Sequence, residues 1–600
     1  MYSESYRTMA CRRFIGLAAV LGVVLLSGCA NRGVGPQGGP RDSLPPKVVK
    51  EKPENGTLNF ESNKVEIFFD EYIQLTNIPT NVVMSPPQLH PPVIRALGKK
   101  ILISFEDSLV ANTTYTIDFG AAIVDNNERI PLPGYAYSFA TGDHIDTLGI
   151  FGQVINAANL NPVSELTVGI YDDLADSAFE SKPFMRIAKT DSLGYFGIRN
   201  VRPGRYRVYA LNDKSRDYQY QIGEGLAFTP EVYEPYLRSE MAEDSSVTYY
   251  YEPADVLLWY FTEQRKAQYF TRATHPEPHQ LVLTFGAAQD SLPTIKALHD
   301  SIDWAAHMLL QHSQGKDTLV YWINDSIAML DTLRFTLTYQ KTDSAYNLYW
   351  QTDTLRAVYT APRLNARTQA KVDEQKRNKA IAIKSNAKNN FEVYDTLRIM
   401  ADAPLESLET SAVRLSQKID TTYKTVPARI VKGDSIGMVY QVIAAMQAGE
   451  SYELVIDSGA MHDIYGHSNQ SFKSSLKLKR LEDYSSLKVH VRGVEHVVRL
   501  QLLNTKDKVI RELPVENGIA TFNYLPAGAC YLRLYEDLNH DGKWTTGDWS
   551  KKRAPEPVYY FPSKLNLRAN WDFEETFDYQ AIDQLDSKPY EISTTQKPTE

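Results

Sequence analysis

Two patterns in this sequence each occur twice and in the same order, and this repetition limits the chain to folds made of tandem modules. The matching segments are residues 64–71 with 396–403, 113–125 with 450–463, and 191–209 with 516–535. Because single hydrophobic cores stop growing near about 250–300 residues, a chain of 600 residues is in any case expected to divide into several domains.

Apolar and polar residues alternate within these segments, which is the period of a half-buried β-strand. Val65, Ile67 and Phe69 alternate in this way, and so do Ile101 and Ile103. The 37 tyrosines also favour sheets, since a tyrosine suits a pleated face with its hydroxyl outward. Short strands at close spacing predict an all-β chain of tandem antiparallel β-sandwiches.

In both copies of the first pattern a strand that begins with Tyr leads to a Gly-Ala turn and then to an Asp. These residues are Tyr115, Gly120, Ala121 and Asp125, and Tyr452, Gly459, Ala460 and Asp463. The pattern resembles the bacterial Ig-like domain, which implies Ig-like sandwiches over residues 47–143 and 391–482. The segment Phe69-Asp70-Glu71 departs from the family by lacking its proline. The alternative is two unrelated sandwiches that share a general alternation.

In the second pattern a Gly turn precedes a strand, a Pro and a Gly form the next turn, and a strand that begins with Tyr returns. These residues are Gly194, Pro203, Gly204 and Tyr206, and Gly518, Pro526, Gly528 and Tyr531. The pattern resembles the carboxypeptidase-regulatory-like, or transthyretin-like, sandwich, expected over residues 144–230 and 483–575. The resemblance implies a structural spacer without catalytic residues. Cys530 falls in the returning strand, where we expect it to pack as a small hydrophobe.

The remaining segments are assigned by composition and periodicity. We expect a connecting segment over 231–277, a further β-sandwich over 278–365, a basic linker over 366–390 and a tail over 576–600. Residues 294–312 also fit a helix, because their apolar residues recur at three- and four-residue spacing.

The amino terminus has the pattern of a secretory signal. Arg12 and Arg13 precede an apolar run that ends in Leu26-Ser27-Gly28-Cys29. The last four residues resemble the lipobox of bacterial lipoproteins, which implies a signal peptide over 1–28 and acyl chains on Cys29. Residues 29–46, rich in Gly and Pro, are then a lipidated tether. The alternative is an ordinary signal peptide with a chance Cys.

Charge and motifs exclude several functions. The net charge of −9 argues against a nucleic-acid partner, and three cysteines exclude a disulfide framework. No sequence motif of a hydrolase, nucleotide-binding or metalloprotease site occurs. We therefore expect no enzymatic activity and no small-molecule substrate.

One segment has the ligand spacing of a calcium loop. Asp537, Asn539 and Asp541 provide side-chain oxygens at positions 1, 3 and 5, Gly542 follows at position 6, Lys543 offers its carbonyl, and Asp548 stands at position 12. A structural Ca²⁺ is the predicted cofactor. The alternative is a turn whose side chains bond only their own backbone. The first copy has Asp213, Ser215, Asp217 and Glu224 at the same offsets, but Tyr218 replaces the glycine.

The order of lipobox, Pro/Gly tether and alternating sandwiches resembles the Ig-like-domain outer-membrane lipoproteins of Bacteroidota. This resemblance implies an outer-membrane protein anchored by lipid, on the periplasmic or the cell-surface face. The leading hypothesis is a non-enzymatic scaffold that docks on envelope or outer-membrane proteins, as an accessory subunit of an outer-membrane barrel machine. The alternatives are a surface carbohydrate-binding or adhesion module and an unrecognised hydrolase in residues 278–365.

Overall fold

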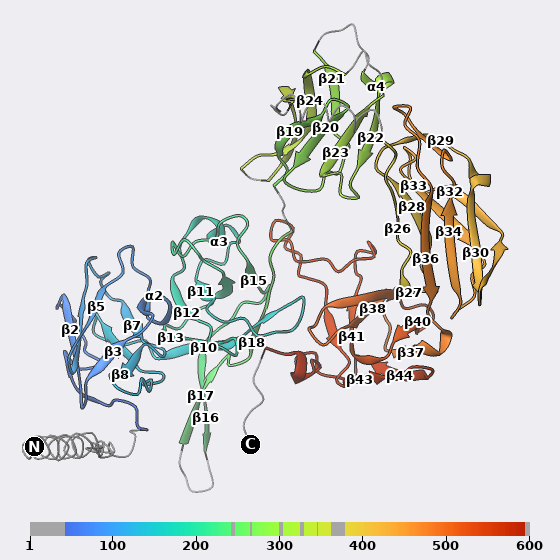
Figure 1. Cartoon of the computed structure of the whole chain (residues 1–600). Helices are drawn as coiled ribbons and strands as arrows, with labels where there is room; N and C mark the ends of the chain where they lie inside the picture. The colour runs from blue at the N-terminus through green and yellow to red at the C-terminus, as the bar shows by residue number, and fades with distance from the viewer. Residues whose placement is uncertain are drawn as a thin grey trace, which may run out of the picture. The chain divides into compact units, whose positions relative to one another are not determined.

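The computed structural model describes residues 43–594 except 242–246, 265–266, 299–303, 325–328, 345 and 362–378. The predicted signal peptide, Cys29, most of the tether and much of the basic linker therefore lie outside the described residues. The described chain folds as five β-sandwiches in tandem, built mostly of antiparallel strands, so the all-β prediction is confirmed (Figure 1). Contacts divide it into two compact units, of which the first sandwich is one and the other four sandwiches are the other.

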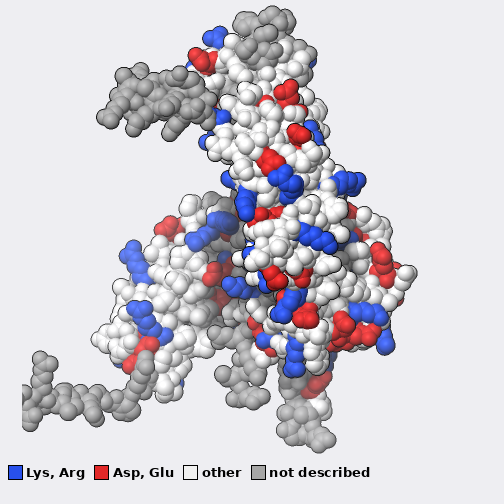
Figure 2. Space-filling model, turned by 45° about the vertical axis from the view of Figure 1, so that its right-hand side comes forward, with Lys and Arg blue, Asp and Glu red and all other residues white. Residues whose placement is uncertain are grey.

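Charged side chains of both signs are mixed over the face of the molecule shown in Figure 2. No helix in the described part of the chain is long and apolar enough to cross a membrane.

The first sandwich buries the alternating residues that the sequence singles out. Val65, Ile67 and Phe69 of β2 are at most 4% exposed and pack with Tyr115 and Ile117 of β7. The sheet orders are β1-β2-β6-β5, β4-β7-β9 and β3-β8. The elements are β1 (Val48–Lys52), β2 (Lys64–Phe69), β3 (Ile73–Leu75), α2 (Ile78–Asn81), β4 (Val83–Ser85), β5 (Val93–Leu97), β6 (Lys100–Ser104), β7 (Thr114–Asp118), β8 (Ile123–Asp125) and β9 (Ala136–Ala140).

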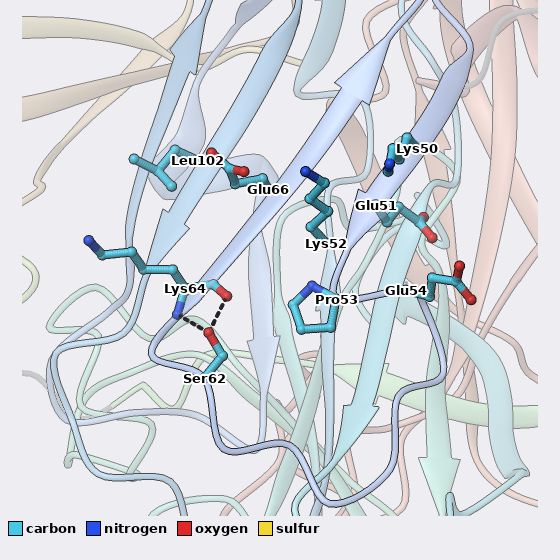
Figure 3. A pocket seen from close by; sticks show the side chains of 9 residues that line it. All are labelled: Lys50, Glu51, Lys52, Pro53, Glu54, Ser62, Lys64, Glu66 and Leu102. Carbon is cyan, nitrogen blue, oxygen red and sulfur yellow. Dashed lines mark hydrogen bonds between the residues drawn. The ribbon is translucent and has the colours of Figure 1, made fainter.

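A pocket of about 610 Å³ opens on this sandwich beside β1 and β2 (Figure 3). Its lining includes Lys50, Lys52 and Lys64 together with three glutamates. The hydroxyl of Ser62 donates to the carbonyl of Lys64 at 2.9 Å and accepts the N–H of the same residue at 3.1 Å. Because this lone hydroxyl is bonded within its own turn and the charges around it are of mixed sign, the pocket is a polar groove on the surface without a marked binding group.

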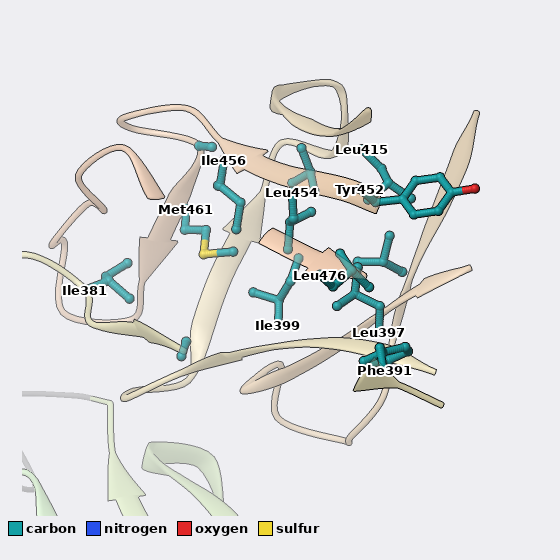
Figure 4. Close-up of a cluster of buried hydrophobic side chains, with 14 of the residues drawn as sticks. Ile381, Phe391, Leu397, Ile399, Leu415, Tyr452, Leu454, Ile456, Met461 and Leu476 are labelled. Atoms are coloured by element: carbon teal, nitrogen blue, oxygen red, sulfur yellow. The ribbon is translucent and has the colours of Figure 1, made fainter. Parts of the chain in front are cut away.

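The fourth sandwich repeats the strand order of the first. Its sheets run β26-β28-β33-β32, β27-β36-β34-β30-β31 and β29-β35, so that β28 corresponds to β2 and β34 to β7. Figure 4 shows its core of side chains such as Ile399 and Leu454. The elements are β26 (Ile383–Ser385), β27 (Asn389–Phe391), β28 (Leu397–Ala401), β29 (Leu405–Leu408), η1 (Thr410–Ala412), β30 (Val413–Ile419), β31 (Thr422–Val426), β32 (Ala428–Lys432), β33 (Val439–Ala444), β34 (Ser451–Ile456), β35 (Met461–Asp463) and β36 (Phe472–Leu478).

Corresponding side chains make the same bonds in these two sandwiches. The hydroxyl of Tyr115 accepts the N–H of Val110 at 2.8 Å, and that of Tyr452 accepts the N–H of Gln447 at 2.7 Å. The conserved geometry extends to the aspartates that end β8 and β35, whose carboxylates accept backbone N–H groups of the following turn. Two unrelated sandwiches would have no reason to share these details, so the repeat is structural as well as sequential.

The second sandwich pairs a sheet of order β13-β10-β18 with one of order β12-β11-β14-β15, and β18 runs parallel to β10. A separate hairpin, β16 (Tyr236–Met241) with β17 (Val247–Glu252), extends from it (Figure 1). The other elements are β10 (Leu148–Asn156), β11 (Thr167–Tyr171), α3 (Ser177–Ser181), β12 (Arg186–Lys189), β13 (Tyr195–Val201), β14 (Arg207–Leu211), β15 (Leu226–Phe228) and β18 (Val256–Tyr260).

The fifth sandwich has the strand order of the second. Its sheets run β40-β37-β44 and β39-β38-β41-β42, and β44 is parallel to β37 as β18 is to β10. Cys530 is buried in β41, and burial raises the pKa of its thiol to about 11. The elements are η2 (Leu481–Asp483), β37 (Tyr484–Arg492), β38 (Val498–Leu503), β39 (Val509–Pro514), β40 (Ile519–Pro526), β41 (Gly528–Glu536), β42 (Val558–Tyr560), β43 (Leu565–Leu567), β44 (Asp572–Asp578) and η3 (Tyr590–Ile592).

The third sandwich packs a sheet of order β19-β20-β23-β22 against one of order β21-β24-β25. Strands β21 and β22 and the four-residue α4 occupy the described part of the segment that also fitted a helix. The elements are β19 (Phe270–Glu277), β20 (Gln280–Phe285), β21 (Thr294–Ala297), α4 (Trp304–His307), β22 (Met308–His312), β23 (Thr318–Ile323), β24 (Thr332–Thr342) and β25 (Leu348–Val358).

Three sandwich boundaries differ from the expected ones. The expected connecting segment 231–277 contains β18, which belongs to the second sandwich, and β19, which belongs to the third. The boundary at residue 575 falls inside β44. Strands β18 and β44 each return to pair with a distant strand, β10 and β37, and local alternation does not reveal such a pairing. Strand β19 instead opens the third sandwich by pairing with its neighbour β20.

Candidate functional site

The predicted calcium loop follows β41 and brings three of its candidate ligands together. Asp537 accepts the N–H groups of Asp541 and Gly542 at 3.1 and 3.0 Å. The amide of Asn539 donates to Asp541 Oδ2 at 3.2 Å, and the N–H of Lys543 donates to Asp541 Oδ1 at 2.8 Å. Burial tends to raise the pKa of Asp541, but these donors and Thr545 hold that pKa below its ordinary value.

The third candidate carboxylate points elsewhere. Asp548 accepts the hydroxyl of Ser550 at 2.7 Å and forms an ion pair with Lys551 at 3.4 Å. The carbonyl of Lys543 lies 3.4 Å from the hydroxyl of Thr545. Among the described residues no group of three or more His, Cys, Asp or Glu side chains is arranged to hold a metal ion. The bonds of Asp537 and Asp541 need no cation, so calcium binding stays a prediction.

Sequence reasoning missed the carboxylate beneath this loop. Glu556 is buried and accepts the N–H groups of Leu538 at 2.9 Å and Thr545 at 2.7 Å. Burial, with the nearby Asp537, raises the pKa of Glu556 above its ordinary value, although these N–H groups act against the shift. Glu556 lies outside the twelve-residue motif, so no sequence pattern marked it as part of this loop.

The weaker counterpart in the second sandwich has the same turn. Asp213 accepts the N–H groups of Arg216 at 2.6 Å and Tyr218 at 2.9 Å. Tyr218 has φ +59°, the left-handed conformation that Gly542 adopts with φ +73°. The turn therefore keeps the same backbone conformation without the glycine. This conformation is less favourable for a tyrosine, because only glycine adopts the left-handed region freely.

The loop leads directly into Trp549, which is 3% exposed and inserted into the second sandwich. Its ring lies 5.0 Å from Phe179, 5.3 Å from Phe228 and 5.8 Å from Tyr209, measured between centroids. The backbone N–H of Trp549 donates to Glu263 Oε1 at 2.7 Å. A tryptophan of the fifth sandwich thus completes an aromatic cluster of the second.

Close backbone approach beside the tryptophan requires a glycine. A Cβ placed on Gly547 would lie 2.5 Å from the ring of Phe261, which is itself buried. Thr546 donates its hydroxyl to the carbonyl of Thr262 at 3.0 Å. The end of the loop therefore packs against Phe261 and Thr262, which directly follow β18.

A second apolar cluster extends this contact between the two sandwiches. Ile155 and Leu160 of the second sandwich pack with Leu503, Tyr535 and other residues of the fifth. The guanidinium of Arg533 donates to the carbonyl of Ala158 at 3.1 Å. Together with the Trp549 contacts, these residues form what we call the 2–5 junction.

The carboxyl-terminal segment crosses the 2–5 junction. The ammonium group of Lys588 donates to the carbonyl of Asn159 at 2.7 Å, to Asn161 Oδ1 at 2.8 Å and to Asp507 Oδ2 at 2.7 Å. Its side chain is 3% exposed, and burial lowers its pKa although Asp507 opposes the shift. Ile592 adds a buried contact from η3. One chain end thus ties both sandwiches together.

Comparisons with known proteins support part of this architecture. Residues 42–141 match a family model described as a bacterial Ig-like domain, which agrees with the resemblance inferred for the first sandwich. No curated protein sequence matches the chain.

Similar solved structures share very low sequence identity with this chain. The major pilin subunit of Bacillus cereus is 8% identical over 72% of this chain and 98% of that one, with a TM-score of 0.15. Native alpha-2-macroglobulin from Escherichia coli, in a structure that spans its domains MG0-NIE-MG1, is 11% identical over 50% of this chain and 97% of that one, with a TM-score of 0.17. The amino-terminal part of the bacterial S-layer protein SbsC is 9% identical over 28% of this chain and 43% of that one, with a TM-score of 0.16.

Proposed function

We propose that this chain is a non-enzymatic outer-membrane lipoprotein, anchored through acyl chains on Cys29, that acts as a multi-domain scaffold for other envelope proteins. In its specific form the proposal makes it an accessory subunit of an outer-membrane barrel machine. The observation that carries it is the 2–5 junction. A buried tryptophan and a buried lysine hold two spacer-type sandwiches, far apart in sequence, in one packed unit.

The physical argument is that a scaffold has to keep its modules in a defined relation. Inter-domain contacts within a chain are usually polar and allow motion unless they are large and hydrophobic. The 2–5 junction is apolar at its centre and carries the chain end across it. The third and fourth sandwiches are therefore inserted between two points of the chain that are held together.

Extraction from cells at native expression tests the proposal. Solubilisation in a mild detergent, followed by native electrophoresis and mass spectrometry, is expected to recover the chain in a complex with a mass well above its own 67.9 kDa. Recovery as a lone monomer would contradict a scaffold role. Protease treatment of intact cells in parallel assigns the face of the membrane, because only a surface-exposed chain is cleaved.

A further inference from the structure

The β16–β17 hairpin presents large apolar side chains that nothing in the described chain covers. Met241 is 75% exposed and Tyr249 is 65% exposed, and every residue from Tyr236 to Met241 is exposed. An isolated two-stranded hairpin is marginally stable in water, and exposed apolar patches of this kind mark interaction sites. The hairpin therefore calls for an explanation other than packing within its own sandwich.

The two faces of the hairpin differ in chemistry. The cross-strand pairs Leu237 with Tyr251, Ser239 with Tyr249, and Met241 with Val247 form one uncharged face. Cross-strand partners share a face because side chains alternate along each strand. At the base of this face Tyr251 packs on Phe151 of β10, with ring centroids 5.3 Å apart.

The opposite face has its own internal partners. The guanidinium of Arg238 is paired with Glu240, and with Glu252 at 3.1 Å. It also lies 4.9 Å from the centroid of the Tyr250 ring. Since these charges satisfy one another, the polar face has no need of a partner and the uncharged face is the one left to be covered.

The edges of the hairpin decide between a lipid and a protein occupant. Among the described residues β16 and β17 pair only with each other, so each strand has an outer edge of free backbone N–H and C=O groups. Hydrocarbon cannot satisfy such groups, whereas a polypeptide strand can. The described hairpin also carries two glutamates against one arginine, and anionic lipid surfaces attract the opposite balance.

We propose that the β16–β17 hairpin is a docking arm that receives a β-strand of a partner protein along an open edge, while apolar side chains of that partner cover Leu237, Met241 and Tyr249. This inference rests on the proposed scaffold function and specifies the surface through which it operates. The partner is defined by its chemistry: an exposed edge strand beside an uncharged, apolar surface.

Photo-crosslinking tests the proposal in the full-length protein at native expression. A benzophenone amino acid replaces Tyr249 in one strain and its neighbour Tyr250, on the opposite face, in another. Tyr249 is expected to link efficiently to one protein, with the linked peptide in an edge strand, and Tyr250 at least about fivefold less. Links from Tyr249 only to lipid, or only to a second copy of this chain, would overturn the proposal.

A matched pair of variants separates this inference from the proposed function. Tyr249→Asp is expected to reduce the recovered partner at least about tenfold, whereas Tyr423→Asp, at a similarly exposed tyrosine of β31, leaves it unchanged. Both side chains are exposed, so the melting temperature serves as the folding control. If Tyr249→Asp retains the complex, the docking arm is wrong and the scaffold stands. If the wild type forms no complex, the scaffold itself is wrong.

Discussion

The indole Nε1 of Trp549 donates a hydrogen bond to Glu180 Oε1 at 2.8 Å, across 369 residues of sequence. Glu180 lies on α3 of the second sandwich, and Trp549 follows the acidic loop of the fifth. The ammonium group of Lys552 lies over the same indole. The loop with the calcium-like spacing therefore positions the tryptophan at the 2–5 junction.

Trp549→Ala is expected to destabilise the unit that contains the 2–5 junction by about 3–5 kcal/mol, the usual cost of truncating a buried tryptophan. Limited proteolysis and thermal unfolding measure the loss. Trp571→Ala is the control, since Trp571 is 55% exposed and should cost little. Equal effects of the two substitutions would show that Trp549 is not buried as described.

Sequence patterns predicted the all-β fold and the first Ig-like domain because the relevant contacts are local. Tyr115 and Tyr452 bond residues five positions earlier, and Asp125 and Asp463 accept N–H groups of their own turns. Each copy of this strand order spans about a hundred residues, so the residues that form it recur as a repeated pattern in the sequence. The resemblance to bacterial Ig-like domains rests on these residues.

The 2–5 junction could not be predicted in the same way. Trp549, Lys588 and Glu556 bond groups that are distant in sequence or lie outside any motif, so no periodicity marks them. The hairpin left a weak signal, since Tyr249-Tyr250-Tyr251 between polar residues is strand-like. Its exposure is a tertiary property that alternation alone does not give.

Calcium is expected to raise the midpoint of unfolding if the predicted loop binds it. At a calcium concentration one hundred times the Kd, the free energy of unfolding increases by about 2.7 kcal/mol. Asp541→Asn should reduce this increase, whereas Asp217→Asn, in the counterpart loop without the glycine, should not. If titration calorimetry shows no binding heat at millimolar calcium and a chelator leaves the melting temperature unchanged, the loop does not bind calcium. It is then a turn whose side chains bond only their own backbone.

Glu556 predicts a defined pH dependence. Because its pKa in the folded protein is raised above its ordinary value of 4.5, the folded state keeps a proton that the unfolded chain has lost. The stability from this group is present below the ordinary value and is lost as the pH rises through the folded pKa. Unfolding measured from pH 4 to 7 should show this loss relative to Glu556→Gln, and parallel profiles would refute it.

Cys29→Ser is expected to abolish incorporation of labelled palmitate and to move the chain from the membrane fraction to the soluble one. The reason is that the thiol is the predicted site of acylation, and acyl chains supply most of the membrane affinity. Cys530→Ser is the control. Unchanged membrane association of Cys29→Ser would contradict the lipid anchor.

Tyr115→Phe and Tyr452→Phe are expected to lower the free energy of unfolding equally, by about 1 kcal/mol each, since each removes one hydrogen bond from a backbone N–H. Tyr195→Phe, at an exposed side chain, is the reference. Urea unfolding followed by a probe in the affected sandwich gives the values. Effects that differ by several kcal/mol would argue against equivalent positions in the first and fourth sandwiches.

The distance between the second and fifth sandwiches tests the central claim most directly. Spin labels on cysteines introduced at the exposed residues Arg199 of β13 and Thr521 of β40 can be measured by pulsed electron resonance. Cys530 is buried, and its raised thiol pKa protects it from labelling. The account predicts one narrow distance distribution that broadens in Trp549→Ala. A broad distribution in the otherwise unaltered chain would contradict it.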